Sequence, residues 1–370
     1  MGARAVGFFS IVDVEREGYG SLIFKIGITL GFKIVDVETG KKNTPLKYPS
    51  MTIPNYIFNP VLFLLVALLV GPVLVYLERK IAARLQNRIG PYYVGRPHGW
   101  LQIVADGLKL LSKEDIVPKD ADKLLFNLAP LLFASAAIWA FAPIPLDEKI
   151  YIINTDWSLI LVFAIASIEP ITAIMAGWGS SSKYPIISSL RALGQMVSYE
   201  IPFVLGALTP AVFYGTLNIY EIIKFQEDLW FAFIPVIGQI SLLLTLFGLF
   251  AETNRAPLDI AEAESELVSG FNVEYSGIKF GLFYLGEWIY LFAGSLLVSA
   301  LFFGGWHGPL LPGIAWTLIK GFILFSIIVF LRWTFLRLRL DQMTSLSWKV
   351  LVPLSIFNFL LASGYKVLVS

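Results

Sequence analysis

The fold class is decided by residues 56–77, which read YIFNPVLFLLVALLVGPVLVYL and contain no charged side chain over 22 positions. A helix of about 20 mostly apolar residues crosses the hydrocarbon core of a bilayer, so this stretch predicts a transmembrane helix. Seven more segments meet the same criterion: 124–145, 157–178, 192–215, 229–251, 280–306, 310–331 and 350–369. The sequence therefore predicts an all-α polytopic membrane protein with eight transmembrane helices.

The composition excludes an ordinary soluble enzyme and a disordered chain. Of the 370 residues, 56% are hydrophobic and 15% are charged, whereas soluble domains contain about 25% charged residues. The net charge is +1, so it gives no reason to expect a nucleic-acid partner. We expect the lipid bilayer to be the main surroundings of this chain.

The residue types that hold metals and cofactors are scarce. The chain has no cysteine and only two histidines, His98 and His307. The lack of cysteine excludes disulfides, a thiol nucleophile and Cys-ligated zinc or iron–sulfur clusters in this chain. Two distant histidines are too few for a bis-His haem array. We therefore expect no bound cofactor here, and the metal centres of any redox reaction would belong to a partner.

The distribution of basic residues predicts the orientation. Segments 78–123, 179–191, 252–279 and 332–349 contain 9, 2, 2 and 4 Lys or Arg, whereas the alternate loops contain 1, 1 and 0. Loops rich in Lys and Arg stay inside, so the first set is predicted to be inner and both termini outer. Residues 1–55 form an N-terminal extension of no readable role before a membrane domain at 56–370.

The first inner loop contains an amphipathic pattern. Leu101, Val104, Leu108 and Leu111 recur at helical spacing, with polar and charged residues between them. This pattern predicts an amphipathic helix that lies in the inner membrane interface. A purely structural surface helix would show the same periodicity.

The third inner loop is acidic. It holds six carboxylates, Glu252, Asp259, Glu262, Glu264, Glu266 and Glu274, against two bases, Arg255 and Lys279. Pro257 is suited to the first turn of a short helix, in which Asp259, Glu262 and Glu266 would share one face. Crowded carboxylates repel, so some of them are expected to exchange protons near neutral pH. The alternative is a solvated acidic face.

Carboxylates also lie inside the predicted spans. Glu169, Glu200 and Glu287 interrupt apolar segments, where each charge costs a few kcal/mol and usually faces a cavity or a polar pathway. Lys320 is the only base placed as deeply. These carboxylates, with Glu252 at the inner end of the fifth span, suggest a proton route. The alternative is that each is paired with a polar neighbour and only contributes to packing.

Several motifs resemble the H-subunit family (mitochondrial subunit 1) of respiratory complex I. The resemblance covers about residues 56–370, in order and at the expected spacing, and it is strongest in the third inner loop. Its stretches are LERK at 77–80, RIGP at 88–91, ADGLK at 105–109, GW at 177–178, LRA at 190–192, SYE at 198–200, AETNRAPLD at 251–259, EAESEL at 262–267, EYSG at 274–277, DQ at 341–342 and WK at 348–349.

The resemblance implies a function and a set of partners. Members of this family anchor the peripheral arm, line the chamber through which quinone reaches the last iron–sulfur cluster, and link quinone reduction to proton movement in antiporter-like subunits. Quinone would be the substrate, and iron–sulfur clusters and flavin would lie in partner subunits on the inner face. Antiporter-like and small membrane subunits would be further partners, and a prokaryotic plasma membrane the location.

The resemblance also assigns residues. Eight fall on the coupling carboxylates of the family: Glu200, Glu252, Asp259, Glu262, Glu264, Glu266, Glu274 and Glu287. Six fall near the quinone chamber and its mouth: Glu78, Arg79, Arg84, Asp106, Lys109 and Arg255. Glu169 departs from the family pattern, which has an apolar residue there, and the extension at 1–55 lies outside it.

Three alternatives remain at the level of sequence. The first is the equivalent subunit of a membrane-bound hydrogenase or a ferredoxin-linked complex. The second is a stand-alone proton-coupled secondary transporter, although such carriers tend to contain internal repeats and none is found between the two halves. The third is a pure membrane anchor whose carboxylates only pack.

Overall fold

A computed structural model of the chain describes residues 53–261 and 264–369. All regular elements in this part of the chain are helical, and it contains no strand. The predicted all-α class is therefore confirmed for these residues. The N-terminal extension lies outside them apart from its last three residues, and so do Glu262 and Ala263.

The elements follow one another along the chain as α-helices joined by connections of varied length. Their bounds are α2 Ile53–Leu85, α3 Gln102–Ser112, α4 Lys123–Trp139, α5 Ser158–Ala166, α6 Ile168–Gly179, α7 Lys183–Tyr214, α8 Ile219–Phe225, α9 Ile237–Glu252, α10 Glu264–Leu267, α11 Gly277–Phe302, α12 Gly313–Thr334, α13 Leu340–Leu346 and α14 Val352–Val369. Two 3₁₀ turns, η1 Phe231–Phe233 and η2 Gly270–Asn272, and a π-helical turn at Ser347–Leu351 complete the set.

Helices lie on all eight segments that the sequence predicted to span. Within the described residues, six stretches are long and apolar enough to cross a membrane: Asn59–Leu85, Ser158–Gly179, Lys183–Tyr214, Gly277–Phe302, Gly313–Thr334 and Leu340–Leu368. The remaining two are the shorter apolar helices α4 and α9, of 17 and 16 residues. An integral membrane protein is thus confirmed, whereas the count of eight spans stays a prediction.

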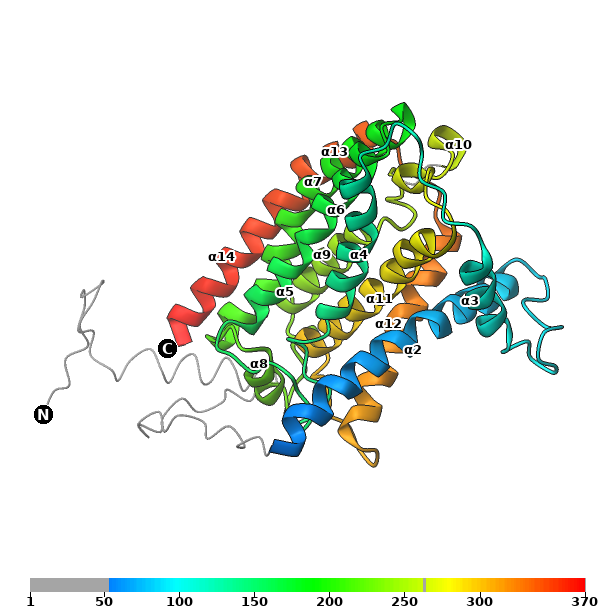
Figure 1. Cartoon of the computed structure of the whole chain (residues 1–370). Coiled ribbons are helices and arrows are strands. Elements are labelled where there is room, and N and C mark those ends of the chain that lie inside the picture. The colour runs from blue at the N-terminus through cyan, green and yellow to red at the C-terminus, as the bar shows by residue number, and fades with distance from the viewer. Residues whose placement is uncertain (1–52, 262–263, 370) are drawn as a thin grey trace, which may run out of the picture. The chain divides into compact units, whose positions relative to one another are not determined.

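The bundle is built around α11. In its most apolar window, 89% of the residues are buried, and α2, α4, α9 and α12 pack against it (Figure 1). A second helix with many neighbours is α7, which packs against α6, α9 and α14. Small residues let membrane helices approach closely. At Gly248 α9 lies so close to α7 that an added side chain would collide with Phe203.

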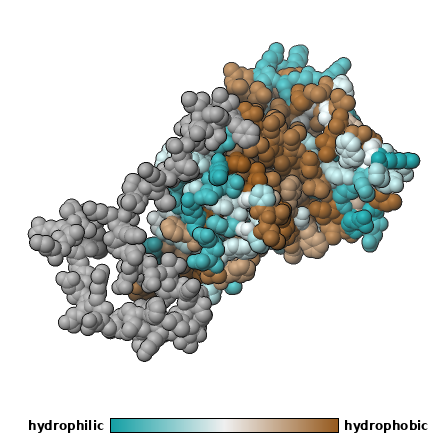
Figure 2. Space-filling model, turned by 90° about the horizontal axis from the view of Figure 1, so that it is seen from below, coloured by the Kyte–Doolittle hydropathy of each residue, from teal (hydrophilic) through white to brown (hydrophobic). Residues whose placement is uncertain are grey.

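The bundle has two distinct ends. The α3 end carries α3, α10 and α13, and the α8 end carries α8 and the connection between α11 and α12 (Figure 1). All four loops that are rich in Lys and Arg begin or finish at the α3 end. An apolar band lies between more hydrophilic surfaces in Figure 2, as expected of a molecule that spans a bilayer.

The first inner loop contains a helix where the sequence predicted one. This helix, α3, has no buried residue, and Val104, Leu108 and Leu111 are exposed on it. Its predicted position in the membrane interface stays a prediction.

The predicted helix at Pro257 is wrong. The chain makes turns from Asn254 to Ala261, and α10 begins only at Glu264. Leu258 and Ile260 are buried in the core, and the carbonyl of Pro257 accepts a hydrogen bond from the N–H of Leu338. These contacts with distant segments override the local helix signal.

Candidate functional site

The site starts from a buried ion pair beside α11. Glu287 of α11 faces Arg255, which lies just after α9, with 3.6 Å between Oε2 and Nη2. Their side chains are only 6% and 3% exposed. The guanidinium of Arg255 also lies over the ring of Trp288, 3.9 Å from its centroid. Since an unpaired buried charge costs several kcal/mol, Glu287 and Arg255 depend on each other.

A second pair joins α2 to α12. Arg332 Nη1 donates to Glu78 Oε1 at 2.5 Å, and Glu78 is buried. The two residues lie 254 positions apart in the chain. This contact holds the two helices together at the α3 end of the bundle and keeps a carboxylate at that end of α2.

The next residue of α2 holds α3. Arg79 Nη1 lies 2.5 Å from Asp106 Oδ2, and Gln102 Nε2 donates to Asp106 Oδ1 at 2.8 Å. Tyr284 of α11 lies within electrostatic range of Glu78, Arg79, Arg255 and Glu287. Four of the six predicted chamber residues therefore gather around the half of α11 nearest the α3 end.

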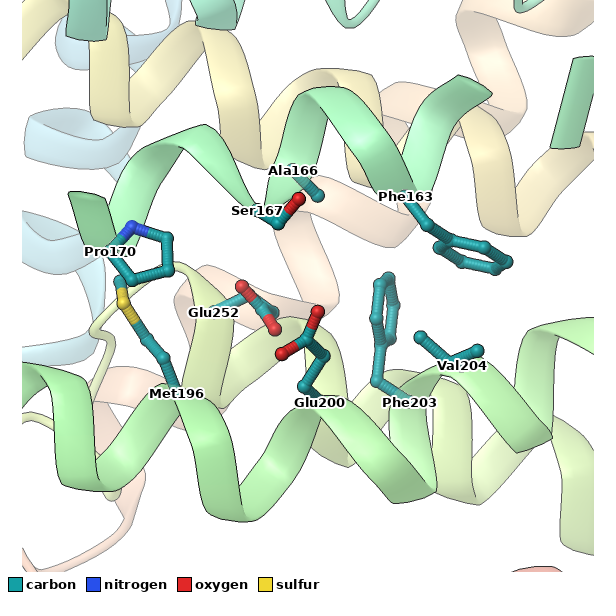
Figure 3. A pocket seen from close by; sticks show the side chains of 9 residues that line it. All are labelled: Phe163, Ala166, Ser167, Pro170, Met196, Glu200, Phe203, Val204 and Glu252. Carbon is teal, nitrogen blue, oxygen red and sulfur yellow. The ribbon is translucent and has the colours of Figure 1, made fainter. Parts of the chain in front are cut away.

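Deeper in the bundle two carboxylates face each other. Glu252 at the end of α9 and Glu200 of α7 point toward one another across a small pocket (Figure 3). The pocket is small, with a cavity volume of about 10 Å³, and its other lining residues are Phe163, Ala166, Ser167, Pro170, Met196, Phe203 and Val204. Pro170 has no N–H to donate to the carbonyl of Ala166 one turn earlier, so a backbone oxygen is freed beside the carboxylates.

A third carboxylate and a phenol lie near this pair. Glu169, in the first turn of α6, is 4% exposed. Tyr290 of α11 is buried within electrostatic range of Glu169, Glu200 and Glu252. The in-span carboxylates that the sequence singled out thus lie around one helix, α11, although Glu287 and the Glu200–Glu252 pair belong to separate groups.

The acidic loop does not form one continuous row among the described residues. Asp259 and Glu274 are partly buried in turns. Glu266 of α10 accepts a hydrogen bond from Arg191 of α7 at 2.6 Å, and this bond and the charge of Arg191 hold the pKa of Glu266 below its ordinary value. Glu266 is therefore not one of the carboxylates whose pKa is raised by crowding with like charge. Glu262 lies outside the described residues, and for Glu264 only the backbone, in α10, is described.

Two predicted chamber residues lie apart from the others. Arg84, in the last turn of α2, and Lys109 of α3 are exposed. Conversely, sequence reasoning assigned no site role to Arg332, Trp288, Tyr284 or Tyr290. A basic residue at the inner end of a span was the available signal for Arg332, because such a residue needs a partner when it is drawn into the bundle.

Comparison with known proteins places this sequence in a family. A family model described as NADH dehydrogenase matches residues 58–363. The chain belongs to the NADH dehydrogenase family. The resemblance found in the motifs is confirmed by this match, and all fourteen predicted site residues lie within it.

Individual members of the NADH dehydrogenase family are similar over most of their length. The H subunit of NADH-quinone oxidoreductase from Desulfotalea psychrophila is 39% identical over 327 residues, which is 85% of this chain and 98% of that protein. The H subunit from Geobacillus sp. strain WCH70 is 42% identical over 76% of this chain and 85% of its own length. That of Bacillus thuringiensis strain Al Hakam is 39% identical over 88% and 98%.

Proposed function

We propose that this chain is the membrane subunit of a proton-translocating NADH-quinone oxidoreductase that forms the quinone chamber and couples quinone reduction to proton translocation. Its relatives are named as subunits of that enzyme, so the chain acts as part of an enzyme complex and not alone. The observation that carries the proposal is the arrangement of buried charges on either side of α11. One group at the α3 end can meet quinone, and the other, deeper group can hold protons.

The quinone head group would lie at the α3 end. Glu78, Arg79, Asp106 and Arg255 lie there, with Arg84 and Lys109 nearer the surface. The exposed apolar side chains of α3 would guide the tail from the lipid. A pocket with a few polar anchors in apolar surroundings is the usual form of a small-molecule site.

The chemistry would bring negative charge next to these anchors. Reduction of quinone to quinol takes up two electrons and two protons, and the electrons would come from iron–sulfur clusters in a partner subunit, with flavin further away. A quinone that has taken up electrons but not yet protons is an anion, which would attract Arg255 and so weaken the hold of Arg255 on Glu287. Glu287 then binds a proton more readily. Glu252 and Glu200 would pass on the change in protonation.

The membrane topology follows from the same proposal. The α3 end, with its Lys- and Arg-rich loops, would face the inside of a prokaryotic plasma membrane and meet the peripheral subunits. Antiporter-like and small membrane subunits would lie beside the bundle. We propose eight spans, because α4 and α9, of 17 and 16 residues, reach about 25 Å. Both termini would then be outer.

Photolabelling of the purified complex tests the chamber. A photoreactive quinone analogue should label peptides from the end of α2 and from α3, and excess quinone should protect them. Labelling confined to other subunits would contradict the chamber role of this chain.

The subunits that co-purify in mild detergent separate the other candidates. Iron–sulfur and antiporter-like subunits without nickel support the proposal. A nickel-containing large subunit would indicate a membrane-bound hydrogenase. A chain that transports a substrate by itself would indicate a secondary transporter.

A further inference from the structure

The connection between α11 and α12 wraps around a buried lysine at the α8 end. Lys320 of α12 is 7% exposed. Its Nζ donates hydrogen bonds to the carbonyl oxygens of Phe303 at 2.7 Å, Gly305 at 2.8 Å and His307 at 2.7 Å. These three oxygens belong to the residues that directly follow α11.

The geometry favours the charged form of this lysine. Three acceptors at hydrogen-bond distance require three N–H donors, and an ammonium has three whereas a neutral amine has two. The ring centroids of Trp230 and Trp316 lie 4.6 and 5.9 Å from Nζ, where a cation is attracted to the ring faces. The carbonyls at a helix C-terminus are also negatively polarised. Lys320 is therefore held as a cation.

No carboxylate neutralises this cation in the described part of the chain. The ion pairs among residues 53–261 and 264–369 do not include Lys320. The nearby carboxylate of Glu148 pairs instead with Lys224 of α8, at 3.6 Å. Lys320 is therefore a buried base that no carboxylate of the described residues meets in an ion pair.

A glutamine closes the same end. Gln226 Nε2 donates to the carbonyls of Ala300 at 3.0 Å and Leu301 at 3.1 Å, and its Oε1 accepts from the N–H of Gly304 at 3.1 Å. We call Lys320, Gln226 and the connection at 303–307 the α8-end cap. Its buried polar groups bind each other, so the cap offers few free groups to a water chain.

An apolar stretch of α11, in which the buried hydroxyl of Ser299 has no hydrogen-bond partner among the described residues, separates the cap from the carboxylates. Residues 291–302 are buried apart from the half-buried Gly294, and their only polar side chains are Ser295 and Ser299. Ser295 donates to its own helix, at the carbonyl of Leu291. From Tyr290 to Phe303 the helix rises about 20 Å. No titratable residue of α11 lies in this interval.

We propose that Lys320 is a proton barrier that closes the α8 end of this subunit. The inference rests on the proposed function, in which protons move among Glu287, Glu252 and Glu200. A proton that travelled along α11 toward the α8 end would meet the buried positive charge of Lys320, and like charges away from bulk water repel strongly. The cap would thus keep coupling protons from escaping across the membrane through this chain.

The test uses the whole complex in sealed liposomes that contain a pH-sensitive dye. Passive proton leak is measured after a pH jump, without NADH or quinone. We expect Lys320→Met to raise the leak about tenfold, since a unit charge about 10 Å away at an effective dielectric constant of about 20 changes a barrier by that factor. Lys320→Arg keeps the charge and should stay as tight as the wild type.

A second lysine provides the matched control. Lys366 of α14 donates one hydrogen bond, to the carbonyl of Tyr214 at 3.2 Å at the C-terminus of α7, and it lies away from α11. Lys366→Met should leave the leak unchanged. Quinone reduction, measured with an uncoupler present, should be close to that of the wild type in all three variants.

Two outcomes would overturn the barrier. One is a Lys320→Met complex that assembles, reduces quinone and is as tight as the wild type. The other is loss of assembly in both Lys320→Met and Lys320→Gln with an intact Lys320→Arg complex, which would show a purely structural role. A wild-type complex that moves no protons during turnover would refute the proposed function instead, and the substrate-free leak would still report on Lys320.

Discussion

At the scale of single residues, the site depends on charges that cannot be buried alone. Arg255 is the best example, because it is shared between the carboxylate of Glu287 and the ring of Trp288. Neither contact could be predicted from the positions of these residues in the sequence. The motif places Arg255 near the chamber, but only the fold shows that its partner is a residue 32 positions further on.

Neutralising Arg255 should destabilise the complex more than neutralising both partners. Arg255→Met removes the guanidinium that lies 3.6 Å from the buried carboxylate of Glu287, and breaking a buried ion pair costs about 3–5 kcal/mol, whereas Arg255→Met with Glu287→Gln removes both charges. We expect the single variant to lower the midpoint of thermal disassembly and the double variant to restore it without restoring coupled turnover. Equal midpoints for the two variants would contradict the pairing.

The role of Glu169 in a proton route is predicted from this sequence alone and not from the family resemblance. This residue is buried near Tyr290 and the Glu200–Glu252 pair. If it takes part in the proton route, Glu169→Gln should assemble normally and move fewer protons per quinone reduced, because an amide cannot exchange a proton. A wild-type ratio in this variant would assign Glu169 to packing.

The pair of Glu266 and Arg191 predicts a pH dependence. Arg191 depresses the pKa of Glu266 in the folded state, so its stabilising effect is present above the ordinary glutamate pKa of about 4.3 and is lost as the pH falls through the lower folded value. Because Glu266 is exposed, the effect is small. Arg191→Gln should lower the thermal midpoint slightly at neutral pH and not at pH values below the folded pKa. A pH-independent difference would contradict this origin.

At the scale of elements, long apolar runs predicted helices well and short polar signals did not. Each run of about 20 apolar residues became a helix because a backbone in lipid must satisfy its own hydrogen bonds. The prediction of a short helix at Pro257 failed. Leu258 and Ile260 are buried and Pro257 binds Leu338, and these contacts fix that segment in turns. The turn at Ser167 between α5 and α6 was also not predicted.

Close helix contact is needed to align the carboxylate pair. Gly248→Ala would push α9 away from Phe203 of α7 and so shift Glu252 relative to Glu200. We expect a strong loss of assembly or of coupled turnover. Gly364→Ala in α14 is the control, since a Cβ there meets no atom within 4 Å. The account of the α7–α9 contact fails if both variants behave as the wild type.

At the scale of the whole molecule, α11 relates the two groups of charges. Tyr284, Glu287 and Tyr290 lie on successive turns of this helix, the first two beside the α3-end group and the last beside the deeper pair. The sequence identified most of these carboxylates because charges are rare within spans. It could not identify which residues meet, since pairs such as Glu78 and Arg332 join the two ends of the chain.

The central claim is that the buried carboxylates of this chain link quinone reduction to proton movement. The most direct test is the number of protons moved per quinone reduced in liposomes that contain the purified complex with Glu200→Gln. Glu227→Gln is the control, because Glu227 is exposed at the α8 end. The account predicts that Glu200→Gln assembles but loses most of its proton translocation, whereas Glu227→Gln matches the wild type. Full proton translocation in an assembled Glu200→Gln complex would contradict it and favour a pure membrane anchor.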